Sequence, residues 1–328
     1  MDEARLSRMD INIIERFEDE PLVSVVIPTW NRKEKLKRCI DSILANNYQN
    51  KEIIVVDDYS DDGTPKAVRE WYPMVKLVES KEKLLLAGAR NRGILESKGE
   101  FIFLIDDDNV IASDAISVLA KAMLADDSLG IAFPLTFYYN DPNVVWADTI
   151  DRNMFTSKTL FKGRGKIYSG EIKGPLETKE VLNAFMIRKS VFQRVGLFDD
   201  RNFPICYDEA DFSQRVLKAQ YKILTFPGAK VWHDIVEYRG IRTIYIERHI
   251  RSELNAYYLA RNRIIFHKLY SNKTQLLIFL LIFLPLFIIY YLIIILIGKL
   301  PFKNRLKSCR SYLEGTIDGL RKQFNNLD

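Results

Sequence analysis

Three consecutive carboxylates, Asp106, Asp107 and Asp108, directly follow the apolar run 101–105. No basic residue lies within this cluster, so its charge must be balanced by a cation or by basic groups from elsewhere in the chain. In an open α/β sheet, ligands bind beyond the carboxyl ends of the strands, where carboxylates can hold a divalent metal together with a phosphate. An Asp-x-Asp pair also occurs by chance in acidic loops. Its position after a buried strand nevertheless favours a Mg²⁺ or Mn²⁺ site at Asp106 and Asp108.

A second apolar run, 51–56, ends in the same way at Asp57 and Asp58. The residues that follow favour a turn and then a helix that begins at Thr64, because Pro is well tolerated at the first helical position. Such a turn is compatible with a role in binding. Asp57 or Asp58 could accept hydrogen bonds from a base or ribose while the later residues form the turn.

Apolar runs and helical patterns alternate along the first 125 residues. We expect strands at 22–28, 51–56, 75–79 and 101–105, and helices at 33–46, 65–72, 87–97 and 113–125. This βαβ alternation predicts an α/β fold with a mostly parallel sheet flanked by helices. Farther on, we expect strands at 130–136, 181–188 and 221–226, the last followed by a Pro-Gly turn, and a helix at 207–220. Residues 137–180 are interpreted as loops and short strands that form a mobile lid.

The expected helix 207–220 begins with Asp208, Glu209 and Asp211. Carboxylates in a first helical turn are stabilised by the helix dipole, which is one explanation for them. A cap needs only one carboxylate, so a general base at the edge of a cleft is the functional alternative. Among the histidines, His233 is the best candidate for a ligand, although a single histidine is more often structural.

Composition limits the classes of function. The net charge is +5, with the basic residues concentrated between Arg239 and Lys322, and this pattern fits an anionic membrane surface better than nucleic acid, for which no binding module is recognisable. The three cysteines are widely spaced, which indicates neither a disulfide framework nor a zinc site. The first residues lack the apolar stretch of a signal peptide, so we expect the body of the protein in the cytoplasm.

Residues 276–297 form an uncharged, almost wholly apolar stretch interrupted by Pro285. Its length suffices to cross a hydrocarbon core of about 30 Å. Basic residues flank both ends, so the positive-inside rule gives no orientation. We expect a membrane segment that either spans the bilayer or lies in its plane, bent at Pro285.

Several blocks in order resemble the family 2 glycosyltransferases, which are inverting enzymes of the GT-A fold. The blocks lie between about residues 20 and 235 and include Val-Ser-Val-Val-Ile-Pro-Thr-Trp-Asn at 23–31, Asp57-Asp58, Ala-Gly-Ala-Arg-Asn at 87–91, the acidic cluster and Tyr-Asp-Glu-Ala-Asp at 207–211. The blocks at 257–263 and 313–320 are similar to the tails of rhamnosyltransferase-type members that build surface glycans.

The resemblance implies a role for each group of residues. It assigns the nucleotide-sugar donor to Pro28, Asn31, Asp57, Asp58, Arg90, Asn91 and Asp107, the metal to Asp106, Asp108 and His233, and catalysis to Glu209, Asp211 and Asp208. The family usually has Glu-Asp-x-Asp at the last block, so either Glu209 or Asp211 could be the base. Arg261 and Arg263 are candidates for contact with the phosphate of a lipid-linked acceptor.

The resemblance also implies a metal-assisted transfer of a sugar to a hydroxyl or phosphate of a lipid-linked or cell-surface glycan, as in polysaccharide or protein glycosylation. The alternative is a catalytically silent, nucleotide-binding membrane scaffold. We expect an N-terminal extension (1–19), a GT-A domain (20–235), basic juxtamembrane helices (236–274), a hydrophobic membrane segment (275–298) and a basic amphipathic tail (299–328). The catalytic domain is expected on the cytoplasmic side of the plasma membrane.

Overall fold

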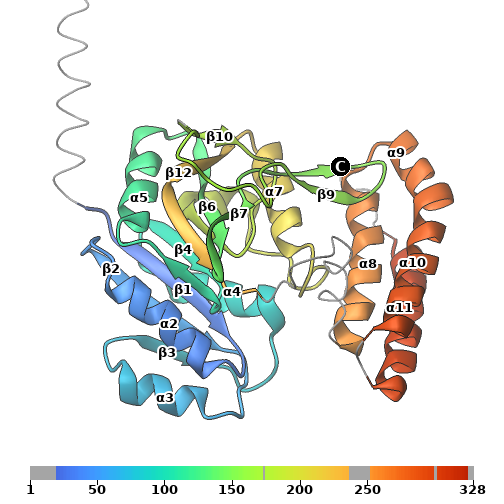
Figure 1. Ribbon diagram of the computed structural model, residues 1–328, viewed down its shortest axis with the longest axis horizontal. Helices are drawn as coiled ribbons and strands as arrows, with labels where there is room; N and C mark the ends of the chain where they lie inside the picture. Colours follow the sequence, from blue (N-terminus) through green and yellow to red (C-terminus); the bar gives the residue numbers. More distant parts are fainter. Residues whose placement is uncertain (1–19, 173, 236–251, 299–300, 324–328) are drawn as a thin grey trace, which may run out of the picture. The chain divides into compact units, whose positions relative to one another are not determined.

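The computed structural model describes residues 20–172, 174–235, 252–298 and 301–323 (Figure 1). The predicted N-terminal extension and the first part of the predicted juxtamembrane region, 236–251, lie outside the described residues. The chain forms two compact units. The first comprises the chain up to Ile150 together with Phe161–Leu197 and Ser213–Ile235, and the second comprises Asp151–Leu160, Phe198–Phe212 and the chain from Val236 onward.

The first unit is built on a mixed sheet with the strand order β10-β12-β6-β11-β4-β1-β2-β3, to which β5 adds on β12 and β7 on β6. The strands are β1 (Val23–Thr29), β2 (Lys51–Asp57), β3 (Lys76–Glu79), β4 (Phe101–Ile105), β5 (Asn109–Ile111), β6 (Leu129–Tyr138), β7 (Asp141–Ala147), β10 (Leu176–Glu177), β11 (Ala184–Arg188) and β12 (Lys222–His233). The block β3-β2-β1-β4 is parallel, as is the long pair β6-β12. The predicted α/β fold with a mostly parallel sheet is confirmed, and β11 reverses direction between β4 and β6.

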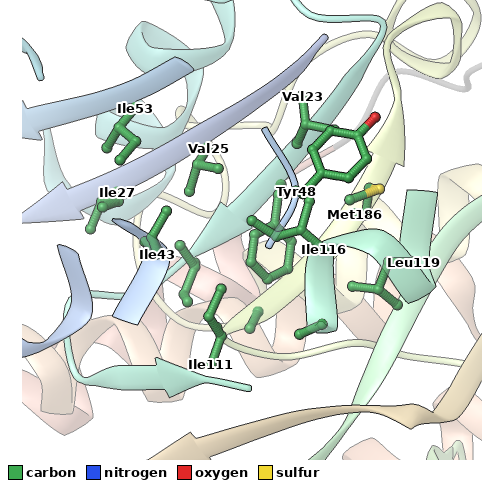
Figure 2. Packing of buried hydrophobic residues seen from close by; sticks show 14 of the residues in the cluster. Val23, Val25, Ile27, Ile43, Tyr48, Ile53, Ile111, Ile116, Leu119 and Met186 are labelled. Atoms are coloured by element: carbon green, nitrogen blue, oxygen red, sulfur yellow. The ribbon is translucent and has the colours of Figure 1, made fainter. Parts of the chain in front are cut away.

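Helices cover both faces of this sheet. They are α2 (Lys33–Leu44), α3 (Thr64–Trp71), α4 (Leu85–Glu96), α5 (Ala115–Ala125), α6 (Lys189–Val195) and α7 (Asp208–Lys218), of which α7 begins in the second unit. On one face, the alternate β1 residues Val23, Val25 and Ile27 pack with Ile43 of α2 and Leu119 of α5 in a single apolar cluster (Figure 2). The alternation follows from the period of two of a strand, which sends the intervening residues to the other face.

The opposite face of β1 and β2 is covered by α4, which approaches them closely at Gly93. A Cβ atom at this glycine would lie 2.2 Å from a methyl group of Val26 and 3.1 Å from one of Val56. Both valines are buried in the sheet, so neither can move aside. The absence of a side chain at position 93 therefore sets the distance between helix and sheet.

The strand β12 differs from its prediction. It continues through Pro227-Gly228 to His233, and the expected turn is instead a register shift against β6 between Phe226 and Lys230. The prediction was wrong here because a Pro-Gly pair was taken to end the strand, whereas an irregularity in the ladder also accommodates a proline. The short strand β5 was not predicted.

The segment 137–180 contains the short strands that its composition indicated. In addition to β7 and β10, it holds the two-stranded sheet of β8 (Ile150–Asn153) and β9 (Lys158–Phe161). Its role as a mobile lid stays a prediction.

The C-terminal part of the second unit is helical, with α8 (Glu253–Tyr270), α9 (Lys273–Ile278), a π-helical turn (Phe279–Phe283), α10 (Leu284–Ile297) and α11 (Phe302–Arg321). The π-helical turn ends two residues before Pro285, whose ring has no N–H and crowds the preceding turn of a regular α-helix. From Lys273 to Ile297 the chain is long and apolar enough to cross a membrane, and only 22% of its most apolar window is buried.

His267 of α8 packs on this apolar run. Its ring stacks on Phe279 with a centroid distance of 3.8 Å. Burial, together with the positive charges of Arg152 and Arg263, lowers the pKa of His267 to about 3, so the ring stays neutral in the folded protein.

Replacing Gly93 with alanine is expected to destabilise the first unit by about 1–3 kcal/mol, because the added methyl group overlaps Val26. Leu95→Ala is the matched control on the same helix, since Leu95 is 68% exposed and its truncation should change the stability by less than about 0.5 kcal/mol. Denaturant unfolding followed by circular dichroism measures both variants. Equal stabilities would contradict the close approach of α4 to β1.

Candidate active site

The acidic cluster lies in a turn at the end of β4. The backbone N–H of Asp106 donates to the carbonyl of Asn183 (2.7 Å), and that of Asn109 donates to the carbonyl of Asp106 (3.1 Å). The side chain of Asp106 accepts a hydrogen bond from the guanidinium of Arg90 (2.8 Å), which is buried inside the first unit. Arg90 therefore balances the charge of Asp106 from below the surface, and its predicted direct contact with the donor stays a prediction.

Asp107 points into the protein. It accepts hydrogen bonds from the hydroxyl of Thr29 (2.8 Å) and from the guanidinium of Arg32 (3.0 Å). Burial raises the pKa of Asp107, although these two contacts oppose the shift. Asp107 thus connects the end of β4 to the last residue of β1 and to Arg32, which follows that strand.

Asp108 lies beside His233, with 3.3 Å between Oδ1 and Nε2. The contact depends on the antiparallel pairing of β5 with β12, which sets His233 opposite Asn109. The backbone N–H of Asp234 also donates to the carbonyl of Asp108 (2.8 Å). Two of the three predicted metal ligands are therefore brought together, although 125 positions separate them in the sequence.

The surroundings of Asp108 favour its charged form. Burial alone would raise its pKa, but His233, Arg32 and Lys35 outweigh this effect and hold the pKa of Asp108 well below its usual range. The guanidinium of Arg32 lies 3.2 Å from its Oδ2. Asp108 is consequently an anionic oxygen ligand at neutral pH.

These residues fit a divalent cation in part. Among the described residues, no group of three or more His, Cys, Asp or Glu side chains is arranged to hold a metal ion. The pair of Asp108 and His233 offers one oxygen and one imidazole nitrogen, and Nδ1 of His233 is buried without a hydrogen-bond partner. A Mg²⁺-like cation usually keeps waters and takes substrate phosphate oxygens in addition to one or two protein carboxylates, so two protein ligands are compatible with such a site.

The loops that follow β1 and β2 are bound to each other. The backbone N–H of Asn31 donates to the hydroxyl of Ser60 (2.8 Å), and its side-chain amide exchanges two hydrogen bonds with Asp61 (2.7 and 2.9 Å). Asn31 has a φ of +53°, a conformation that asparagine tolerates better than most residues. Pro28, which was also predicted to contact the donor, is buried in β1.

Asp57 and Asp58 have different environments. Asp58 accepts hydrogen bonds from the backbone N–H groups of Leu84 (2.6 Å) and Leu85 (3.1 Å), so it fixes the start of α4. Asp57 accepts one from the N–H of Ser60 (2.9 Å), while its Oδ1 is buried with no hydrogen-bond partner. Burial raises the pKa of Asp57 above its usual range, although the hydrogen bonds from Ser60 oppose this. Of the two, Asp57 has the oxygen that a ligand could still satisfy.

Several residues near these carboxylates were not among the predicted site residues. Arg32, the residue before α2, and Lys35 in the first turn of α2 lie close to Asp108. Trp30 is 51% exposed, and the ammonium of Lys83 lies 3.6 Å above its ring. An exposed aromatic residue directly after a buried strand is a signal that could have identified Trp30, since a planar base can stack on such a ring.

The predicted catalytic carboxylates belong to the second unit. Asp208 and Asp211 are buried, whereas Glu209 is partly exposed. The hydroxyl of Tyr270 on α8 donates to Oδ1 of Asp211 (2.6 Å). The two alternatives for the base therefore differ in accessibility.

Arg261 and Arg263 also lie in this unit. Arg261 donates to the carbonyl of Asn202 (2.8 Å). The buried guanidinium of Arg263 donates to the hydroxyls of three tyrosines, Tyr207, Tyr291 and Tyr312. Their predicted contact with a lipid phosphate stays a prediction.

A mixed sheet of this order, with acidic residues at the carboxyl ends of its parallel strands, defines a GT-A-like α/β protein. The sequence profile of glycosyl transferase family 2 matches residues 24–196. The chain belongs to this family, and the predicted membership of the family 2 glycosyltransferases is confirmed.

Known proteins agree with this assignment. The chain is 27% identical over 230 residues to the probable glycosyltransferase YdaM of Bacillus subtilis, which covers 67% of this chain and 52% of the relative. It is 28% identical over 128 residues to the UDP-Glc:alpha-D-GlcNAc-diphosphoundecaprenol beta-1,3-glucosyltransferase WfgD of Escherichia coli, covering 39% and 48%. The chain thus spans at most 52% of the length of either relative.

Among solved structures, the mannosyltransferase PcManGT of Pyrobaculum calidifontis, in complex with GDP-Man and Mn²⁺, has a similar fold. The TM-score is 0.55 with 20% sequence identity, and the match covers 97% of this chain and 93% of that one.

The different hydrogen bonding of Asp57 and Asp58 can be tested by measuring the stability of variants. Asp58→Asn should lower the free energy of unfolding by about 1–3 kcal/mol, since one of the two backbone N–H groups loses its acceptor. Asp57→Asn should leave the melting temperature unchanged or raise it, because a carboxyl whose pKa is raised on folding costs stability when it ionises. Thermal unfolding at pH 7 compares the variants. A larger loss for Asp57→Asn would refute the assignment.

Proposed function

We propose that the protein is an inverting glycosyltransferase that moves a sugar from a nucleotide-sugar donor to a lipid-linked or cell-surface glycan. The observation that carries the proposal is the pair of Asp108 and His233 at the acidic end of β4, in a chain that belongs to glycosyl transferase family 2. This pair supplies ligands suited to a cation that accompanies a diphosphate.

The donor is held by residues at the carboxyl ends of β1, β2 and β4. The unpartnered oxygen of Asp57 accepts a hydrogen bond from the nucleoside, and Trp30 stacks on the base. Asp108 and His233 would hold a divalent metal, and that metal would supply positive charge to neutralise the departing diphosphate. The relation to PcManGT, whose structure contains GDP-Man and Mn²⁺, makes Mn²⁺ the first metal to examine.

Glu209 is the general base in this proposal. It is partly exposed, whereas Asp211 is buried and accepts a hydrogen bond from Tyr270. Glu209 removes the proton from the acceptor hydroxyl as that oxygen attacks the anomeric carbon, so a single displacement inverts the configuration without a covalent intermediate on the enzyme. Asp208 and Asp211 are buried on the same helical turn as Glu209, and Asp211 is held there by the hydroxyl of Tyr270.

The acceptor in this proposal is a lipid-linked glycan, and the enzyme works at the cytoplasmic side of the plasma membrane. WfgD, a relative, is named for a diphosphoundecaprenol-linked acceptor. The apolar helical run Lys273–Ile297 supports residence in the membrane, because large apolar side chains such as Leu281 (68%) and Ile289 (58%) are exposed along it. A core helix of a soluble protein would bury them.

Membrane residence predicts that the full-length chain stays with the membrane fraction after an alkaline carbonate wash. The double substitution Leu281→Lys and Ile289→Lys should release it, since each charge within the bilayer costs about 2.5–3.5 kcal/mol. Leu95→Lys, at an equally exposed leucine of the first unit, should not. Wild-type protein in the soluble fraction would refute the proposal. Protease protection of the C-terminal tail distinguishes a spanning helix from one that lies in the plane.

Enzyme activity is tested with the purified full-length chain, a panel of nucleotide sugars that includes activated rhamnose, and lipid-linked glycans extracted from bacterial membranes. We expect release of nucleoside diphosphate that requires a divalent metal, and a product of inverted anomeric configuration. Glu209→Gln should lower kcat by about 10²- to 10⁴-fold through loss of the base. Asp108→Asn should also abolish the dependence of the activity on metal. Glu70→Gln, on the exposed side of α3, should leave both kcat and this dependence unchanged.

The alternative, a catalytically silent scaffold, gives a different result in the same assay. It would show thermal stabilisation by nucleotide sugars, because a ligand that binds the folded state raises its stability, but no transfer with any donor.

A further inference from the structure

Helix α8 makes a series of hydrogen bonds to the segment Asn202–Asp211, which precedes and begins α7. Arg261 donates to the carbonyl of Asn202 (2.8 Å). The side-chain amide of Asn262 donates to the carbonyls of Ile205 (2.9 Å) and Cys206 (3.1 Å). Asn262 is fully buried, so these two bonds are made away from water.

The segment held in this way has an unfavourable backbone. Cys206 and Tyr207 both have positive φ angles, +63° and +65°, although neither is glycine or asparagine. Two consecutive side-chain-bearing residues in the left-handed region persist only when their surroundings hold them. Asn262 supplies part of this restraint at the carbonyl of Cys206.

Arg263 restrains the next residue. Its Nε lies 3.2 Å from the hydroxyl of Tyr207, while its other nitrogens donate to Tyr312 (3.3 Å) and Tyr291 (2.8 Å). The ring of Tyr207 also packs under the guanidinium of Arg152, at 4.6 Å from the centroid. One buried cation thus connects the turn before α7 to α10 and α11 through three tyrosine hydroxyls.

The fourth contact reaches a carboxylate directly. The hydroxyl of Tyr270, in the last turn of α8, donates to Oδ1 of Asp211 (2.6 Å). Asp211 is buried, so the direction of its side chain is set by the groups that contact it. Around this bond, Phe203, Ala210 and Phe266 form an apolar cluster.

We infer that α8 positions the acceptor-side carboxylates, with Tyr270 and Asn262 as positioning residues for Glu209. The inference rests on the proposed function, in which Glu209 is the base. Tyr270 fixes Asp211, two residues beyond Glu209 on the same helical turn, and Asn262 fixes the backbone that leads into that turn. Neither residue contacts the reacting atoms in this account.

Tyr257 provides a matched control for Tyr270. It lies on the same helix, and its hydroxyl donates to a carboxylate of α11, Asp318, over a similar distance of 2.7 Å. Tyr270→Phe and Tyr257→Phe therefore each remove one tyrosine–aspartate hydrogen bond from α8. Only the first of these bonds reaches the segment that carries Glu209.

In the transfer assay, Tyr270→Phe should lower kcat by about 10- to 100-fold, because a small displacement of a catalytic group is costly. The KM for the donor should stay within about twofold of wild type, because the change does not alter the donor residues. Tyr257→Phe should leave both constants unchanged. Equal losses in the two variants, or no loss in Tyr270→Phe, would overturn the positioning role.

Hydrogen–deuterium exchange of the same full-length proteins tests the anchoring without activity. Tyr270→Phe and Asn262→Ala should increase exchange of the amides in 202–212, with β1 and β4 unchanged, whereas Tyr257→Phe should not. Unchanged exchange in 202–212 would overturn the anchoring. If wild-type protein transfers no sugar, the proposed function fails, and the exchange result still decides whether α8 holds the turn.

Discussion

The acidic end of β4 brings three carboxylates into a region with little water, and the charge of each must be balanced. Arg90 balances Asp106 from the interior, and Arg32 contacts both Asp107 and Asp108. His233 completes the arrangement at Asp108. These contacts come from α4, from the residue before α2 and from β12, so the charged side chains of the turn hold the elements around β4 together. The need to balance this charge explains why contacts from several elements of the first unit converge on three residues of one turn.

The second unit contains a turn with an unfavourable backbone, at Cys206 and Tyr207, which other residues must hold in place. Polar side chains of α8 donate hydrogen bonds to the segment Asn202–Asp211. The guanidinium of Arg263 is buried beside tyrosine hydroxyls, not beside carboxylates. A buried guanidinium that donates to neutral hydroxyls retains its charge and its hydrogen bonds. Helix α8 therefore contributes to the local structure of the turn that contains the proposed base, and through Arg263 it also contacts Tyr291 of the apolar helix α10. In the proposed function, the C-terminal helices serve both as a membrane segment and as a support for catalysis.

Local patterns were sufficient to predict much of this structure. The strand before Asp106 and the helical spacing of Leu36, Ile40 and Ile43 follow from short-range periodicity, and both are found. The contacts that give the site its chemistry are not local. Asp108 meets His233 only because β12 continues past a Pro-Gly pair and pairs with the unpredicted strand β5. Asp57 and Asp58 look equivalent in the sequence, yet the N–H groups of Leu84 and Leu85 engage only Asp58. Tyr270 and Asp211 are likewise 59 positions apart.

In the proposed function, Asp108 and His233 together hold a divalent cation beside the donor diphosphate. The most direct measurement is anomalous diffraction from crystals of the full-length protein grown with Mn²⁺ and a nucleoside diphosphate. The proposed function predicts one strong manganese peak within coordination distance of both Asp108 and His233. A bound nucleotide with no manganese at these two residues, or manganese held elsewhere, would contradict it.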